Sequence, residues 1–172
     1  MKIIMFGMLA LMSFLSFTTE SFASNTGNEQ FTIYLVRHAE KLTDQKNPPL
    51  TTCGVKRAQQ LATTLEQAKI TQIYSTQTQR TEQTAAPLAT QLSLNVISYS
   101  AKDLAAFSQQ IKSTRKNTLI VGHSNTTPQL TALIANTPVD DITEAEYQML
   151  YQVHFQNETA KLTLLKQPLS CH

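Results

Sequence analysis

Two arginines and two histidines stand at three places in the chain where they could act together on an anion. Arg37 and His38 end an apolar run, Arg80 opens a helical stretch, and His123 ends a second apolar run. No matching cluster of carboxylates accompanies them, and the planar fork of arginine suits paired contacts with phosphate oxygens. If the fold brings these side chains together, we expect them to hold a phosphoryl group, with His38 as the reacting group.

Alternating strands and helices are the elements that must position these side chains. Apolar runs rich in β-branched residues predict strands at 31–36, 70–74, 92–99 and 118–121, with helical spacing of apolar residues between them. Residues 147–155 and 159–165 predict a hairpin around Asn157-Glu158. This order predicts an α/β fold: a three-layer α/β/α sandwich around a mostly parallel sheet of about six strands, one of them antiparallel.

Such a sheet would place the chemical motifs on one rim. Open α/β sheets bind ligands beyond the carboxyl ends of their strands. Arg37, His38 and His123 leave such ends, and Arg80 follows the second strand by half a turn of helix. Helix N-termini after the second and fourth strands would add backbone N–H groups. Asn125 at one of these starts is either a further phosphate contact or only a helix cap.

A glycine, a proline and several aromatic residues give more specific predictions for individual helices and strands. Gly54 lies in the first turn of a helix that Thr51 or Thr52 would cap, so we expect its backbone to pass close to another segment. Pro87 predicts a kink or an early end of the second helix. The aromatic residues of the final hairpin are expected to pack on the sheet face: Tyr147, Tyr151 and Phe155.

The first 23 residues have the pattern of a secretory signal peptide. Lys2 gives a positive start, and Ser21-Phe22-Ala23 is a small-x-small cleavage pattern after an apolar run of about fifteen residues. That run is shorter than the roughly 20 residues of a membrane-spanning helix. We therefore expect cleavage near Ala23 and an exported, periplasmic protein without stable membrane insertion. A single domain would cover residues 24–172.

Charge and cysteine content narrow the possible partners. The formal net charge is +2 over 172 residues, and no concentrated basic run is present, which argues against a nucleic-acid binder. Cys53 and Cys171 could form one disulfide in an oxidising compartment or remain two thiols. The sequence does not indicate an oligomeric state.

Three segments resemble those of a known family. LVRHAEK, STQTQRTEQTAAPLA and VGHSNT look like the motifs of the histidine phosphatase superfamily, also called phosphoglycerate-mutase-like. The resemblance extends to PPLTTCGVKRAQQLA and is greatest to small single-domain phosphatases with RHAE and GHSNT. It implies a phosphoglycerate-mutase-like fold and a phosphoric monoester hydrolase without a cofactor. Its partner would be a small phosphorylated substrate or an envelope phosphate group.

The resemblance also implies roles for the motif residues. His38 would attack phosphorus and become a transient phosphohistidine, while Arg37, Arg80 and His123 would hold the phosphoryl oxygens. No metal is needed for this chemistry. Two histidines and Glu40 could be imagined as metal ligands, but the flanking arginines disfavour a bound dication.

The proton donor remains open between two carboxylates. A general acid should protonate the leaving alcohol. Asp103 stands where the resemblance suggests such a group, although it would equally suit a helix N-cap. Glu40 beside the nucleophile is the other candidate. Two further functions also remain open, a phosphomutase of the same superfamily and a non-catalytic phosphate-binding or interaction module.

Overall fold

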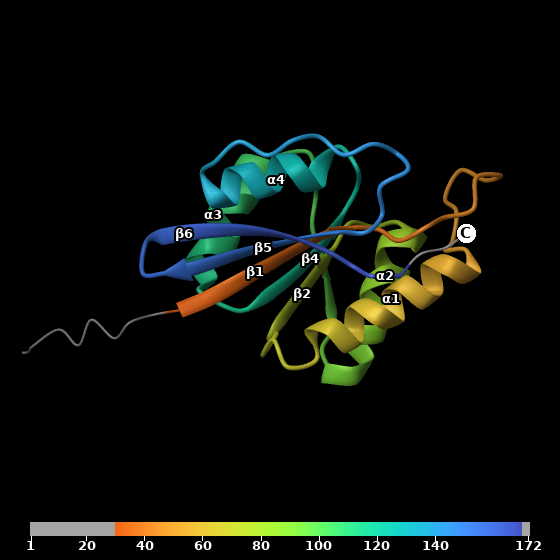
Figure 1. The fold of residues 1–172 in the computed structure, drawn as a ribbon, viewed down its shortest axis with the longest axis horizontal. Helices are drawn as coiled ribbons and strands as arrows, with labels where there is room; N and C mark the ends of the chain where they lie inside the picture. The colour runs from red at the N-terminus through yellow and green to blue at the C-terminus, as the bar shows by residue number, and fades with distance from the viewer. Residues whose placement is uncertain (1–29, 170–172) are drawn as a thin grey trace, which may run out of the picture.

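A six-stranded sheet runs through the middle of the molecule, with helices on both sides (Figure 1). The computed structural model describes residues 30–169. Its elements, in chain order, are β1 (Gln30–Arg37), α1 (Thr52–Leu65), β2 (Gln72–Ser75), α2 (Gln79–Leu92), β3 (Val96–Ser98), α3 (Leu104–Thr114), β4 (Thr118–Gly122), α4 (Thr126–Ala135), β5 (Met149–Gln156) and β6 (Thr159–Lys166).

The strand order places the two motif-bearing strands side by side at the centre of the sheet. The order is β3-β2-β4-β1-β5-β6, and the first four strands of this order are mutually parallel. β5 pairs antiparallel with both β1 and β6, so it alone runs against the others. Arg37 pairs with Gly122 and Ser75 with Val121, so the carboxyl ends of β1, β2 and β4 meet at one edge.

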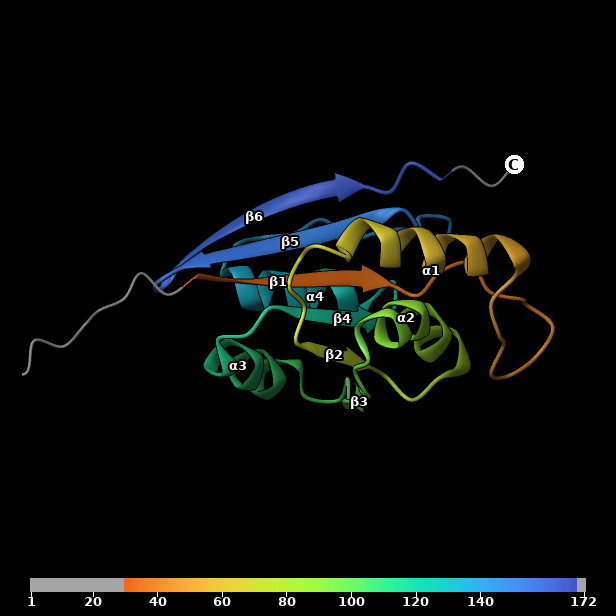
Figure 2. The same cartoon turned by 90° about the horizontal axis from the view of Figure 1, so that it is seen from below.

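Alternate residues of the strands supply two separate apolar layers. Along β1, Ile33 and Leu35 face one layer, whereas Val36 faces the other, as the two-residue period of a strand requires. Figure 2 shows α1 and α2 in front of the sheet and α4 behind it. The layer shared with α1 and α2 includes Leu61, Leu65, Ile73, Leu88 and Leu119, and the layer shared with α3 and α4 includes Phe107, Ile111, Ile120, Leu130 and Ile134. The expected three-layer α/β/α fold is confirmed.

Two element boundaries differ from the sequence prediction. α2 continues past Pro87 to Leu92, so an early end at the proline is wrong. Leu88 and Ala89 are buried, and their packing compensates for the backbone hydrogen bond that a proline cannot make. The longer helix occupies the start of the range expected for the third strand, and β3 is reduced to three residues paired with the short strand β2.

The glycine at the start of α1 marks a close backbone approach, as expected. A Cβ on Gly54 would lie 2.2 Å from the carbonyl oxygen of Glu40. Thr51 caps the helix by accepting a hydrogen bond from Gly54 N at 3.0 Å, and its own N–H donates to that same Glu40 carbonyl at 2.9 Å. The first turn of α1 is thereby fixed against the loop that follows β1.

Several sequence expectations concern residues outside the described range. The expected signal peptide, residues 1–23, is outside it, and so is Cys171. Cys53, near the start of α1, is disulfide-bonded. Among residues 30–169, no helix is both long enough and apolar enough to cross a membrane.

Candidate active site

The structure brings the four cationic or titratable motif residues together at the carboxyl edge of the sheet. The backbone N–H of His38 donates to the carbonyl of Gly122 at 2.9 Å, which joins the ends of β1 and β4. The rings of His38 and His123 are 5.5 Å apart between centroids, edge to face. Arg80 reaches His123 from the first turn of α2, with 3.4 Å between Nη2 and Nδ1. Arg37, immediately before His38, completes this group.

His38 is held as a neutral imidazole with one nitrogen free of a proton. Its Nδ1 lies 2.8 Å from the carbonyl oxygen of Ala39, which can only accept, so Nδ1 carries the proton and Nε2 keeps its lone pair. Burial lowers the pKa of His38 to about 3, and the charges of Arg37 and Arg80 add to the effect. The side chain is therefore a nucleophile at neutral pH without an activating base.

Thr84 of α2 links the backbone next to His38 to the backbone of Arg80. The N–H of Ala39 donates to Thr84 Oγ1 at 2.9 Å, and that hydroxyl donates to the carbonyl of Arg80 at 2.7 Å. Thr84 is buried, so these bonds are shielded from water. The loop after β1 and the first turn of α2 are thus held at a fixed spacing.

His123 is oriented by a short chain of hydrogen bonds. Because Arg80 can only donate, Nδ1 of His123 accepts, and the ring proton lies on Nε2. Nε2 then donates to Thr76 Oγ1 at 2.8 Å, and that hydroxyl donates to Thr81 Oγ1 at 3.1 Å. Burial, followed by the charges of Arg80 and Arg37, lowers the pKa of His123 to about 4. Both histidines of the site are therefore neutral at neutral pH.

Arg37 is buried beneath the loop that joins α4 to β5. Arg37 as a whole is 2% exposed, and its Nη1 donates to the carbonyls of Thr143 at 3.0 Å and Glu146 at 3.3 Å. Nη2 is paired with the carboxylate of Glu144 at 2.5 Å. The guanidinium carbon lies 4.1 Å from the centroid of the Tyr147 ring, a cation–π contact.

Sequence reasoning missed this loop as a part of the site. Tyr147 was expected to pack on the sheet, which is wrong, because β5 begins only at Met149 and the Tyr147 ring covers Arg37 instead. Tyr151 and Phe155 do lie in β5 and are buried in the core, as expected. The direction of β5 was the available signal: an antiparallel neighbour of β1 begins at the edge where β1 ends.

Buried donors at the site lack partners. Among the residues that the structure describes, Nε of Arg37 and Nε of Arg80 are buried and make no hydrogen bond. Buried polar groups are nearly always satisfied in folded proteins. Two unsatisfied guanidinium donors beside a neutral histidine favour an anion as the missing acceptor.

In the described part of the chain, neither carboxylate considered as a proton donor makes a hydrogen bond or ion pair with the side chains of the four-residue group. Glu40 is bound by Arg57, whose Nε lies 2.9 Å from both carboxylate oxygens and whose Nη2 lies 2.5 Å from Oε1. Asp103 caps α3, with Oδ1 accepting from Ala106 N at 2.9 Å. Asn125 is exposed at the N-cap of α4 and makes no side-chain capping bond.

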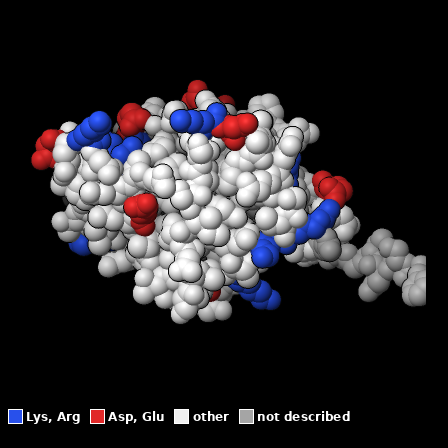
Figure 3. All heavy atoms as spheres, turned by 180° about the vertical axis from the view of Figure 1, so that it is seen from behind, with Lys and Arg blue, Asp and Glu red and all other residues white. Residues whose placement is uncertain are grey.

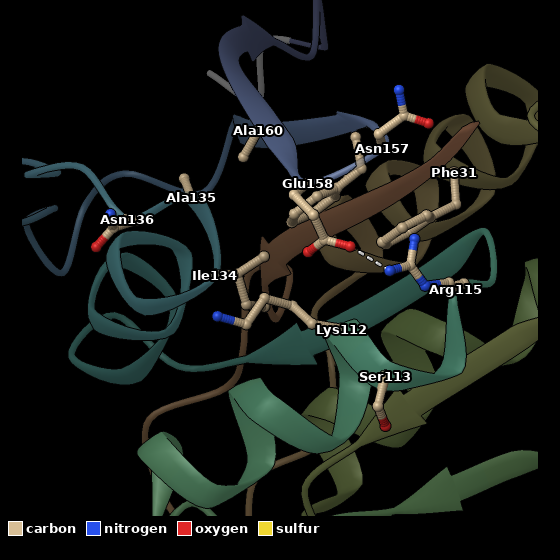
Figure 4. Close-up of a pocket in the computed structure, with 11 residues that line it drawn as sticks. Phe31, Lys112, Ser113, Arg115, Ile134, Ala135, Asn136, Asn157, Glu158 and Ala160 are labelled. Carbon is tan, nitrogen blue, oxygen red and sulfur yellow. Dashed lines mark hydrogen bonds and ion pairs between the residues drawn. The ribbon is translucent and has the colours of Figure 1, made fainter. Parts of the chain in front are cut away.

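Other parts of the described chain offer different chemistry. A pocket of about 600 Å³ lies at the opposite end of the sheet, between the ends of α3 and α4 and the turn that joins β5 to β6 (Figure 4). An ion pair between Arg115 and Glu158 crosses it, and none of the four motif residues lines it. No group of three or more His, Cys, Asp or Glu side chains within residues 30–169 is placed to hold a metal ion.

Comparisons with known proteins give one family match and several similar folds. Residues 33–102 match the histidine phosphatase superfamily (branch 1). Among solved structures, the protein histidine phosphatase SixA in complex with tungstate is 17% identical, with a TM-score of 0.63, over 80% of this chain and 97% of that chain. The alpha-ribazole phosphatase from Shigella flexneri is 18% identical, with a TM-score of 0.59, over 79% of this chain and 96% of that chain. A mycobacterial glucosyl-3-phosphoglycerate phosphatase is 15% identical, with a TM-score of 0.61, over 82% of this chain and 100% of that chain. At these identities the solved structures show a shared fold, and no curated protein sequence matches the chain.

Proposed function

We propose that the chain hydrolyses phosphomonoesters through a covalent phosphohistidine on His38, a proposal that the match of residues 33–102 to the histidine phosphatase superfamily supports. The observation that carries this proposal is the state of His38. It is a buried, neutral imidazole whose Nδ1 proton is tied to Ala39 and whose Nε2 lone pair is left for attack.

The reaction follows from that tautomer. Nε2 of His38 attacks phosphorus in line with the ester oxygen, the P–O bond breaks, and its electron pair leaves with the alcohol oxygen, which takes up a proton. As the N–P bond forms, the ring gains positive charge, and the Nδ1–H bond to the Ala39 carbonyl stabilises it. Water then attacks the phosphohistidine, releases inorganic phosphate and restores the neutral ring.

Arg37 and Arg80 are proposed to hold the phosphoryl oxygens during both steps. Their side chains approach from β1 and α2, and each has a buried Nε donor without a partner among residues 30–169. Preplaced cations offset the charge of the phosphate dianion and fix the line of attack, which is most of what phosphoryl transfer requires. His123, neutral and oriented by Thr76, is proposed as a third phosphoryl contact.

The proton donor can be identified by the choice of leaving group. An alkoxide leaving group needs protonation, whereas a nitrophenolate leaves unaided. A variant that removes the acid should therefore slow hydrolysis of alkyl phosphates far more than that of nitrophenyl phosphate. Asp103→Asn and Glu40→Gln are the two variants to compare. Glu40→Gln also disturbs the ion pair with buried Arg57, so its stability must be measured alongside.

We propose that the enzyme works outside the cytoplasm, in the periplasm. The signal-peptide pattern of residues 1–23 supports this location. A disulfide at Cys53 suits an oxidising compartment. The proposed substrate is a small phosphorylated molecule or an envelope phosphate group.

Turnover of a panel of phosphomonoesters tests the proposed function. Wild-type protein is expected to release inorganic phosphate, and His38→Ala is expected to release none above background. His154→Ala is the matched control, because His154 lies in β5 with its Nδ1 3.0 Å from Thr32 Oγ1, away from the rim. Equal turnover by His38→Ala would refute the proposal. A phosphate isomer as the product would indicate a mutase, and phosphate binding without turnover would indicate a non-catalytic module.

A further inference from the structure

Glu144 occupies a position at the rim that a bound phosphoryl group would need. Its Oε2 accepts from Arg37 Nη2 at 2.5 Å, and its Oε1 accepts from the hydroxyl of Ser124, two residues after the end of β4. One carboxylate thus bridges donors that follow two neighbouring strands. Two oxygens of a phosphoryl group would form the same bridge, since they too can only accept.

The two partners of this ion pair differ in how freely they can move. The side chain of Arg37 is 1% exposed, whereas that of Glu144 is 75% exposed. Arg37 is also fixed by the Thr143 and Glu146 carbonyls and by the face of Tyr147. An ion pair whose carboxylate is largely in water contributes little to stability. Glu144 is therefore the partner that can be withdrawn, while Arg37 stays in place.

The charge of Glu144 reaches the rest of the site. The hydrogen bond from Ser124, with the nearby charge of Arg37, holds the pKa of Glu144 below its usual value, so the carboxylate is ionised when no ligand is bound. Its negative charge acts on Arg80 and His123 in the direction opposite to the cations of the site. In the free protein Glu144 thus partly neutralises the group of cations that would attract phosphate.

We propose that Glu144 is an internal competitor for the phosphoryl site, bound to Arg37 in the free protein and displaced when an oxyanion binds. This inference rests on the proposed function, because it takes Arg37 as a phosphate clamp. The competition lowers the apparent affinity for every oxyanion by the same factor, the fraction of molecules in which Arg37 is available. It also favours release of product phosphate, since Glu144 can take back Arg37 as phosphate leaves.

Equilibrium binding of inorganic phosphate and of sulfate to Glu144→Gln tests the proposal without requiring turnover. Glutamine keeps the size of the side chain and removes its charge. We expect both anions to bind to Glu144→Gln about three- to tenfold more tightly than to wild type, and the factor should be similar for phosphate and sulfate. Asp141→Asn is the matched control: Asp141 carries the same charge on the same loop but makes no hydrogen bond or ion pair with Arg37 in the described structure, and its affinities should stay within about twofold of wild type.

Unchanged or weaker phosphate binding by Glu144→Gln would overturn the proposal. Loss of turnover with unchanged phosphate affinity would also overturn it and would make Glu144 a proton donor instead. In both cases wild-type turnover would still stand, so the proposed function would survive. If wild-type protein neither binds phosphate nor hydrolyses phosphomonoesters, the proposed function itself fails and the competitor role fails with it.

Discussion

At the scale of single residues, the site combines neutral imidazoles with permanently charged guanidinium groups. His38 is buried and His123 is half-buried beside Arg37 and Arg80, and loss of contact with water is the main reason why their pKa values fall to about 3 and about 4. A neutral ring can approach a phosphate dianion as a nucleophile, and the arginines supply the positive charge that the reaction needs. Burial is therefore part of the proposed chemistry as well as of the packing.

The lowered pKa of His38 predicts a loss of stability in mild acid. Between the unfolded pKa of 6.5 and the folded value of about 3, the unfolded chain binds a proton that the folded protein does not. The free energy of unfolding should therefore fall as the pH drops below 6.5. At pH 5 the loss should be on the order of 2 kcal/mol for His38.

Urea denaturation at pH 7.5 and pH 5 measures this effect. His38→Asn should lose less stability than wild type between these two pH values. His154→Gln, a histidine substitution away from the site, should behave like wild type. An identical pH dependence in wild type and His38→Asn would contradict the expectation.

Arg80 is predicted to act through its planar fork as well as its charge. Arg80→Lys keeps one positive charge but loses paired donors, so we expect kcat/KM for a phosphomonoester to fall by about 100-fold. Arg115→Lys, at the opposite end of the sheet, should leave kcat/KM within about twofold of wild type. Steady-state kinetics measure kcat/KM for each variant, and full activity in Arg80→Lys would exclude a paired phosphate contact.

The sequence alone was sufficient to predict that Arg37, His38, Arg80 and His123 lie at one edge of the sheet. Each lies at the end of a strand or soon after it, and the apolar runs of these strands are easy to recognise. It could not reveal the pairing of Arg37 with Glu144, because 107 positions separate these two residues. Contacts of a loop with a distant strand depend on the finished fold and leave no local pattern.

At the scale of elements, the site depends on how tightly α1 and α2 are held against the loop after β1. Gly54 touches the Glu40 backbone, and Thr84 bonds the Ala39 N–H. Apolar periodicity predicted both helices, and the propensity conflict at Gly54 correctly indicated a close approach. The proline rule failed at Pro87 because tertiary packing outweighed the local cost.

Gly54→Ala should lower the free energy of unfolding by about 1–3 kcal/mol, since the new methyl group would meet the carbonyl oxygen of Glu40. Gln59→Ala, an exposed position of the same helix, should change it by less than about 0.5 kcal/mol. Chemical denaturation of the two variants checks this. A Gly54→Ala protein as stable as wild type would mean that the two segments can separate without cost.

At the scale of the whole molecule, the surface and the N-terminal sequence bear on where the protein acts. Figure 3 shows a face on which basic and acidic side chains are few and scattered, without a basic stripe. The proposed export depends on residues 1–23, whose pattern only the sequence records.

Expression of the full chain in a Gram-negative host tests the proposed export. We expect the protein in the periplasmic fraction with Ser24 as its first residue, because Ser21-Phe22-Ala23 fits the cleavage pattern. N-terminal sequencing or intact mass measurement identifies the start. Replacement of Ala23 by a bulky residue should impair cleavage. Uncleaved wild-type protein in the cytoplasmic fraction would refute the expected processing.

The phosphohistidine intermediate is the central claim, and its position on the ring is the sharpest consequence of the structure. Because Nδ1 of His38 donates to Ala39, phosphorus must bond to Nε2. Wild-type protein mixed with a labelled phosphomonoester and quenched in mild base should carry a base-stable, acid-labile label, and phosphorus NMR should assign it to Nε2 of His38. Absence of such a label under turnover, or a label on another residue, would contradict the account.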